Sequence, residues 1–324
     1  MKVHVIGCGS AGMHFIRAAS LVNAEQISVS DTSAEMIKTL NDRYKARYNT
    51  PCPVVYGEHK ADVTIIATPP DTHLAMARQA QSEHIIIEKP ICSPGQFDQL
   101  KKADFGSRKV WVNYQYVLHP AIKWLRDNLP VINSPMTAQV FWQEHSDFCA
   151  KAHPWKNDSW YLFDSKRGGG AACEHSHGLA VFVQCLAASG QGTLQTVGHK
   201  LMKDGHDVFS QFDCVTSDDQ GNLLVMGTVI QDFLSRSPTK VLKLACDDVT
   251  AVVDFRSGFC EIYYPDGTER VKDLCISRED EFTLILKHIQ EADYDTSPVA
   301  MKNLLSVQEI LSNHFKEEGH GRVN

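Results

Sequence analysis

The chain has 324 residues, of which 43% are hydrophobic, and its 32 Lys and Arg against 39 Asp and Glu give a formal net charge of −7. Length and composition are typical of a globular protein of about two domains. The charges are dispersed without a basic run, which argues against a nucleic-acid partner. No apolar stretch approaches the roughly 20 residues of a membrane-spanning helix, so we expect no membrane segment.

In the first third of the chain, short apolar runs alternate with stretches of helical period. The runs predicted as strands span residues 2–6, 26–30, 63–67 and 84–88. Helices are predicted over 13–21, 33–44 and 74–82, the second with Ser33 as its N-cap. This alternation implies βαβ units and a parallel, doubly wound sheet.

The pattern changes after about residue 117. Strand-like runs follow one another with turns rather than crossover helices between most of them, at 136–142, 207–216, 222–233, 240–245 and 258–264. Helices are predicted near 171–188, 279–291 and 298–316. We therefore predict an α/β chain with a second, α+β domain built on an open, mostly antiparallel sheet, one face of which is left for a partner.

Three glycines lie between the first strand and the first helix. Gly7, Gly9 and Gly12 form G-x-G-x-x-G, which permits a tight turn, a close approach of backbone to a pyrophosphate, and an anion site at the helix N-terminus. Asp31 ends the next strand about 20 residues further on, where a carboxylate binds the ribose and repels a 2′-phosphate. This predicts a dinucleotide-binding Rossmann domain over 1–118, with NAD favoured over NADP, followed by the second domain over 119–324. The alternative is that the glycines serve packing and Asp31 caps a helix.

Three further motifs occur in order: A-T-P-P-D-T-H at 67–73, E-K-P at 88–90, and G-G-G at 168–170 before a helix. With the glycine motif they resemble the glucose–fructose oxidoreductase, inositol dehydrogenase and rhizopine-catabolism (Gfo/Idh/MocA) family. The resemblance runs from residue 1 to about 255. It implies NAD(P)-dependent hydride transfer on a sugar, inositol or sugar derivative, and a homodimer or homotetramer assembled through the second sheet. The E-x-S-H form at 174–177 resembles a branch found with surface-sugar biosynthesis.

The resemblance assigns roles near the ends of two buried strands. The ledge formed by Thr68, Pro69 and Pro70 would lie against the nicotinamide half of the cofactor, and Lys89 would contact the substrate hydroxyl and the nicotinamide ribose. The simpler alternatives are an ordinary turn, and a surface Lys89 paired with its neighbour Glu88. The bond from Lys89 to Pro90 can be cis. The candidate cofactor-binding residues are Gly7, Gly9, Ser10, Ala11, Gly12, Asp31, Thr68, Pro69, Pro70, His73, Glu88 and Lys89.

Glu174 and His177 are three residues apart in a predicted helix, so we expect them on one face. A histidine beside a carboxylate is a suitable general base, because its pKa lies near neutrality and its imidazolium is stabilised. We predict that Lys89, His177 and Glu174 are catalytic, with His177 as the base; Lys89 as the base is the variant. The alternative is a packed His177 bonded to Glu174. In the family pattern the His aligns with Gly178 and a later Asp with Ala180, so the chain departs there.

The remaining candidates are lower in rank because aromatic side chains are more often part of a core. Arg167, next to the three glycines, could hold a carboxylate or phosphate. The candidate substrate contacts are Tyr114, Gln115, Trp155, Tyr161 and Arg167.

The cysteines bear on location and on metals. None of the ten forms a CxxC pair, and His145 with Asp147 has no third candidate ligand, so we predict no metal. The first residues run directly into an apolar segment without a signal-sequence pattern, which predicts a cytoplasmic protein with reduced thiols.

Two other functions remain open. The departures at Gly178 and Ala180 also suit a catalytically silent NAD-binding sensor or regulator. The dinucleotide-binding half equally suits a reductase of a non-sugar substrate such as a bilin.

Overall fold

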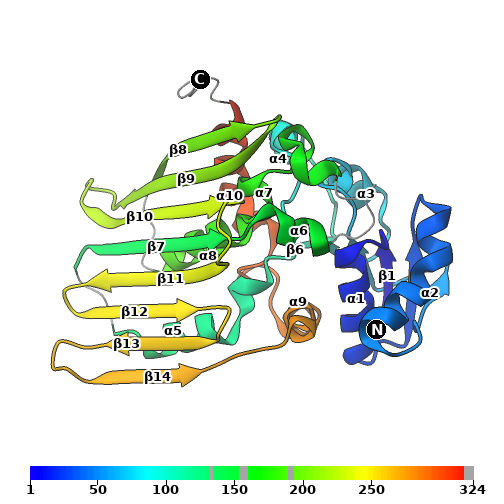
Figure 1. The fold of residues 1–324 in the computed structure, drawn as a ribbon, viewed down its shortest axis with the longest axis horizontal. Coiled ribbons are helices and arrows are strands. Elements are labelled where there is room, and N and C mark those ends of the chain that lie inside the picture. The colour runs from blue at the N-terminus through cyan, green and yellow to red at the C-terminus, as the bar shows by residue number, and fades with distance from the viewer. Residues whose placement is uncertain (131–133, 153–159, 189–192, 317–324) are drawn as a thin grey trace.

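The computed structural model describes residues 1–130, 134–152, 160–188 and 193–316. Two sheets organise the chain (Figure 1). The first is a six-stranded sheet, parallel throughout, in the order β3-β2-β1-β4-β5-β6. Its strands are β1 Lys2–Ile6, β2 Gln26–Ser30, β3 Val55–Tyr56, β4 Val63–Ile66, β5 His84–Ile87 and β6 Lys109–Val112. The doubly wound half of the predicted fold is confirmed, and β3 and β6 are strands that the sequence pattern did not indicate.

The helices of this half follow its strands. They are α1 Ser10–Leu21, α2 Ala34–Tyr48, α3 His73–Gln79 and α4 Phe97–Lys101. Ser33 caps α2 as predicted, since its side chain accepts a hydrogen bond from the N–H of Met36 at 3.2 Å. The central strand β4 has all of its residues buried, which is typical of a parallel sheet covered on both faces.

The second sheet has eight strands in the order β14-β13-β12-β11-β7-β10-β9-β8. All its neighbours are antiparallel except β7 and β10, which confirms the mostly antiparallel prediction. The strands are β7 Met136–Gln143, β8 Thr193–Lys203, β9 His206–Ser217, β10 Leu223–Asp232, β11 Thr239–Cys246, β12 Val249–Asp254, β13 Phe259–Tyr263 and β14 Glu269–Asp273. β8, β12 and β14 were not predicted.

One face of this sheet is covered and the other carries exposed apolar side chains. The predicted helix over 171–188 is broken at His175 into α7 Ala171–Glu174 and α8 Ser176–Ala188, which pack on β9, β10 and β7. Large apolar side chains exposed on the strands include Val197, Met226, Phe259 and Val271. A sheet of this kind has the open face that the sequence predicted.

The C-terminal segment returns to the first sheet (Figure 1). Helix α9 Arg278–Glu291 packs on α1, where the ring of Phe282 stacks on His14 with centroids 4.8 Å apart and meets Phe15 edge-on at 5.0 Å. One continuous apolar core runs through both sheets. The remaining helices are α5 Pro120–Asn128, α6 Ser146–Ala152 and α10 Leu305–Lys316, the last beginning later than the predicted 298.

Candidate active site

The glycine loop is shaped by close backbone contacts. Gly7 has φ of 93°, and a Cβ on it would lie 2.5 Å from the carbonyl oxygen of Ala67; a Cβ on Gly12 would lie 1.9 Å from the carbonyl oxygen of Gly7. Helix α1 begins just after Gly9 with neither a side-chain cap nor an acidic residue in its first turn. Its first N–H groups therefore remain available for the negative charge of a dinucleotide pyrophosphate.

Asp31 is held beside this loop by two backbone N–H groups. Its carboxylate accepts hydrogen bonds from the N–H of Cys8 at 2.7 Å and from the N–H of Ser33 at 2.8 Å. Each carboxylate oxygen has a second lone pair, so the group can still accept from a ribose hydroxyl. The alternative role as a helix cap is met in part, because Asp31 accepts a hydrogen bond from the N–H of Ser33, the N-cap residue of α2.

The loop after β4 is tied to the loop after β5. The ring of His73 lies between the carbonyl oxygen of Thr68, 2.8 Å from Nε2, and that of Pro90, 3.0 Å from Nδ1. His73 is fully buried, and this burial lowers its pKa. Among the described residues it is not part of the cavity lining. In this structure His73 fixes the two loops against each other, and its contact with a cofactor stays a prediction.

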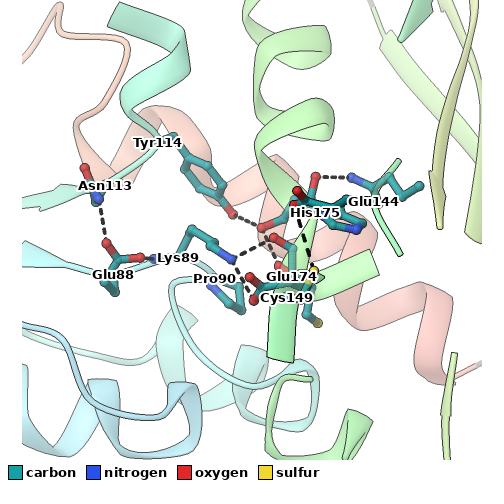
Figure 2. A network of polar contacts seen from close by, with 12 residues as sticks. Glu88, Lys89, Pro90, Asn113, Tyr114, Glu144, Cys149, Glu174 and His175 are labelled. Atoms are coloured by element: carbon teal, nitrogen blue, oxygen red, sulfur yellow. Dashed lines mark hydrogen bonds and ion pairs between the residues drawn. The ribbon is translucent and has the colours of Figure 1, made fainter. Parts of the chain in front are cut away.

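Lys89 stands at the carboxyl end of β5, and its bond to Pro90 is cis. Its ammonium donates to the Oε2 atom of Glu174 at 2.9 Å and to the carbonyl oxygen of the same residue at 2.7 Å (Figure 2). Only 11% of the Lys89 side chain and 21% of the Glu174 side chain are exposed, so the pair is largely shielded from water. The surface pairing with Glu88 is not formed by the Lys89 ammonium among the described residues.

Glu88 faces the protein interior instead. Its carboxylate accepts from the N–H of Lys89 at 3.1 Å and from the side-chain amide of Asn113 at 2.5 Å (Figure 2). Burial raises the pKa of Glu88, and the charge of Lys89 and the two hydrogen bonds oppose that shift. Glu88 thus orients the backbone on which Lys89 is carried.

His177 lies in an aromatic surrounding near the start of α8. Its ring centroid is 5.1 Å from that of Tyr116, 5.7 Å from that of Tyr114 and 6.1 Å from that of Trp142. Burial lowers the pKa of His177 well below its usual value, and the positive charge of Lys89 adds to the shift. The ring is therefore neutral at pH 7, and its Nδ1 atom has no hydrogen-bond partner among the described residues.

The expected pair of Glu174 and His177 is not formed. The spacing assumed one continuous helix, but the break at His175 ends α7 at Glu174, whose carboxylate turns to Lys89. The ring of His175 bonds to the carbonyl oxygen of Asp232 at 3.1 Å, and burial lowers its pKa to about 4. Both expectations about this pair, as a catalytic dyad and as a packed His177 bonded to Glu174, are therefore corrected.

A cavity of about 1260 Å³ joins these features. Of the residues predicted from the sequence, its lining includes Gly7, Gly9, Ser10, Ala11, Asp31, Thr68, Pro69, Pro70, Glu88, Lys89, Gln115, Tyr161, Arg167, Glu174 and His177. Gly12 and Tyr114 lie behind the lining, the latter fully buried with its hydroxyl donating to Ser176 at 3.3 Å. Trp155 lies outside the described residues.

Arg167 has a different partner from the one expected. Its guanidinium binds both carboxylate oxygens of Asp71, at 2.6 and 3.0 Å. A bidentate ion pair uses this edge of the guanidinium, and the expectation that Arg167 holds a substrate carboxylate or phosphate stays a prediction. The pair joins the segment before α7 to the loop after β4 across the cavity mouth.

Sequence reasoning missed the charged and aromatic wall contributed by β11, α9 and the segment before α5. Lys240 shares one face of β11 with the buried Leu242 and Leu244, whereas Lys243 points to solvent. This period-2 pattern was visible in the sequence as a lysine on the apolar face of a strand. Other lining residues that were missed at this end include Tyr116, Glu144, Arg278 and Glu281.

Comparisons with known proteins bear on the family and the fold. Residues 1–114 match the model of the oxidoreductase family with an NAD-binding Rossmann fold, Gfo/Idh/MocA. The family resemblance drawn from the sequence is therefore confirmed over these residues. No curated protein matches the chain in a sequence search.

Solved structures share the fold over nearly the whole chain. UDP-N-acetylglucosamine 3-dehydrogenase from Acidithiobacillus ferrooxidans is 18% identical with a TM-score of 0.65, covering 97% of both chains. Levoglucosan dehydrogenase in complex with NADH and levoglucosan is 14% identical with a TM-score of 0.72, covering 98% of this chain and 96% of that one. Biliverdin reductase from Synechocystis sp. PCC 6803, with biliverdin and NADP+, is 13% identical with a TM-score of 0.66, covering 97% and 98%.

Two kinds of feature are absent from the described residues, a membrane-spanning helix and a metal site. No described helix is long and apolar enough to span a bilayer. Among the same residues, no cluster of His, Cys, Asp and Glu has the arrangement of a metal site.

Proposed function

We propose that this chain is an NAD(P)-dependent oxidoreductase that transfers a hydride between nicotinamide and a secondary alcohol or ketone of a sugar-like substrate. The observation that carries the proposal is the convergence of Lys89, Glu174 and His177 on the cavity that begins at the glycine loop. Two proteins of the same fold, the UDP-N-acetylglucosamine and levoglucosan dehydrogenases, bear the names of sugar substrates.

The residues present fit a dinucleotide. The pyrophosphate would lie at the uncapped N-terminus of α1, over Gly9 and Ser10, where a side chain on Gly7 or Gly12 would clash with backbone. Asp31 would bind the adenosine ribose, which favours NAD over NADP because its carboxylate repels a 2′-phosphate. When bound, the nicotinamide supplies the acceptor or donor of the hydride.

The side chains at the other end of the cavity would hold the substrate and its proton. Lys89, fixed by Glu174, would donate a hydrogen bond to the reacting oxygen. Burial depresses the pKa of His177, so its ring is unprotonated before the reaction, and it would take up the hydroxyl proton during oxidation. In the variant, Lys89 is the base and His177 orients the substrate oxygen.

The test is turnover measured by absorbance of the reduced nicotinamide, with NAD and NADP, over inositols, free sugars, sugar acids and nucleotide-sugars. Lys89→Met and His177→Asn should each lose about 100-fold or more of kcat/KM, which is the usual share of positioned acid–base groups. The matched controls are Lys38→Met and His199→Asn, whose side chains are exposed, and both should keep the wild-type rate. Full activity of the two active-site variants would refute the proposal.

The structure weakens the argument for a catalytically silent sensor, which rested on the departures at Gly178 and Ala180. A Cβ on Gly178 would lie 2.9 Å from Cβ of Trp142, and Ala180 is fully buried. Gly178 therefore has no room for a side chain in this packing, and neither position is among the described residues that line the cavity. The reductase of a non-sugar remains the second candidate, favoured by the shared fold of biliverdin reductase. Turnover of a bilin but of no sugar would establish it.

Three further predictions accompany the proposal. The domain boundary near residue 118, a cytoplasmic location, and a homodimer or homotetramer assembled through the second sheet each await a direct test. The exposed apolar side chains on that sheet support the last of these. Sedimentation of the purified chain would decide its oligomeric state.

A further inference from the structure

Lys240 enters the cavity from β11 and has no carboxylate within ion-pair distance in the described part of the chain. Three other cations of this wall each have such a partner, in the pairs Lys89–Glu174, Arg167–Asp71 and Arg278–Glu281. Arg256 also lines the cavity without a carboxylate partner, but its side chain is exposed and donates to the carbonyl oxygen of Pro238 at 2.6 Å. Among the described residues, Lys240 is therefore the cation inside this end of the cavity whose charge no carboxylate contacts.

The ammonium of Lys240 lies against two aromatic rings. Its Nζ atom is 5.4 Å from the ring centroid of Tyr116 and 5.7 Å from that of Trp142. Its hydrogen-bond partner is the Tyr116 hydroxyl, at 3.4 Å. Since an ammonium has three donors, two remain for a ligand. The same two rings pack around His177, which places this charge beside the proposed proton acceptor.

The surrounding charges limit what the site can bind. Glu144 and Glu281 attract Lys240 and Arg278 repels it, while burial lowers the pKa of Lys240. Glu281 is already engaged by Arg278 and by the Tyr116 hydroxyl, which donates to it at 3.0 Å. Apart from the exposed Arg256, Lys240 is thus the cation left for a ligand, and one ammonium suits a single negative charge better than the two of a phosphate monoester.

We propose that Lys240 binds a carboxylate of the substrate, so that the substrate is a sugar acid. This inference rests on the proposed dehydrogenase function and narrows it. The carboxylate would take the two unused donors of the ammonium, and the aromatic rings would exclude water around the ion pair. The hydroxyl to be oxidised would then lie towards Lys89 and His177.

The experiment compares hexuronates with their matching hexoses, both free and as UDP-sugars, and with glucose 6-phosphate. Turnover is read from reduced nicotinamide, and binding without turnover from the change in intrinsic tryptophan fluorescence, to which Trp142 contributes. Wild-type protein should favour the acids, and Lys240→Met should lower the acid-to-neutral ratio of kcat/KM at least about tenfold, as expected for loss of a charged hydrogen bond. Lys240→Arg should largely preserve the ratio.

The matched control is Lys243→Met, because Lys243 lies three residues along the same strand and points to solvent. It should keep the wild-type ratio. If Lys240→Met does not fold, Lys240→Gln and the wild-type competition between hexuronate and hexose provide the same comparison.

The outcomes separate the two proposals. An acid preference that is unchanged in Lys240→Met, or a preference for neutral sugars, overturns the carboxylate site and leaves the dehydrogenase function standing. Binding of hexuronates that depends on Lys240 without any turnover upholds the site and rejects the function. A stronger, Lys240-dependent preference for the sugar phosphate overturns the assignment to a carboxylate, and absence of both binding and turnover rejects both proposals.

Discussion

The two ends of the cavity are built in different ways. The proposed nucleotide end is built around backbone of two stretches that come close together, the glycine loop and the turn after β4. The proposed substrate end is built around side chains from β5, α7, α8, β11 and α9, which come together only in the folded chain. A backbone site tolerates loss of a side chain but not addition of one, whereas a side-chain site has the opposite sensitivity.

This difference predicts a severe effect of Gly12→Ala. The new Cβ would lie 1.9 Å from the carbonyl oxygen of Gly7, so β1 and α1 must move apart. Overpacking of this kind costs on the order of 3 kcal/mol. If this whole cost distorts the glycine loop, cofactor binding becomes roughly 100-fold weaker. Titration of NADH fluorescence and thermal unfolding measure the two effects.

Gly95→Ala is the matched control for that variant. A Cβ on Gly95 would meet no atom within 4 Å, so cofactor affinity should remain that of the wild type. Wild-type affinity in Gly12→Ala would mean that the loop is not the pyrophosphate site.

At the substrate end, the second-largest effect is expected for Asp207→Asn. The Oδ2 atom of Asp207 accepts from the N–H of Ala172 and from the Ser210 hydroxyl, both at 2.7 Å, and so caps the helix that carries Glu174. An amide nitrogen in place of Oδ2 cannot accept these bonds. We expect kcat to fall about tenfold, in line with one charged hydrogen bond, while cofactor affinity is retained.

That split between kcat and cofactor affinity distinguishes a positioning role from general destabilisation. Asp219→Asn, in the exposed turn after β9, is the control and should leave both quantities unchanged. Equal losses of kcat and of cofactor affinity in Asp207→Asn would mean that the two ends of the cavity are not independent.

The sequence predicts the backbone-built end of the cavity better than the end built from side chains. The glycine motif, Asp31 and the Thr68–Pro70 turn are local patterns whose chemistry depends on backbone, and all of them except Gly12 line the cavity. Lys89, Glu174 and His177 were also predicted, but with the wrong pairing. Helical spacing suggested a partner three residues away, whereas the partner of Glu174 is 85 residues away in the chain.

The residues that the sequence did not predict are those whose neighbours are set by tertiary structure. Lys240 could have been suspected from its place on an apolar strand face, but only the fold brings it beside His177. Arg167 was predicted to contact the substrate. Its ion-pair partner, Asp71, lies 96 residues away in the loop after β4, so no sign of the pair was visible in the sequence. Sequence patterns thus identified reactive residue types, and packing decided which of them pair.

The burial of His175, between α7 and α8, predicts that the stability of the fold depends on pH. The pKa of His175 falls to about 4 in the folded state, so between about pH 6.5 and pH 4 the unfolded chain binds a proton that the folded chain does not. Stability is therefore complete above pH 6.5 and declines as the pH falls, by up to about 1.4 kcal/mol per pH unit for this group.

Urea unfolding at pH 7, 6 and 5 measures this slope. His175→Gln should be less stable than wild type at pH 7 and show a flatter decline, whereas His199→Gln, at a side chain that is 60% exposed, should keep the wild-type slope. Parallel profiles for the wild type and His175→Gln would contradict the folded-state pKa.

The smallest effect is expected at the nucleotide end, for Asp31→Ala. Its carboxylate would lose one or two hydrogen bonds to the ribose, while the pyrophosphate contacts of the backbone remain, so NAD should bind about fivefold more weakly. NADP should bind more tightly than before, because the repulsion of its 2′-phosphate is removed. Asp42→Ala, exposed on α2, is the control. A loss as large as that of Gly12→Ala would show that this end depends on side chains too, and the contrast between the two ends would fail.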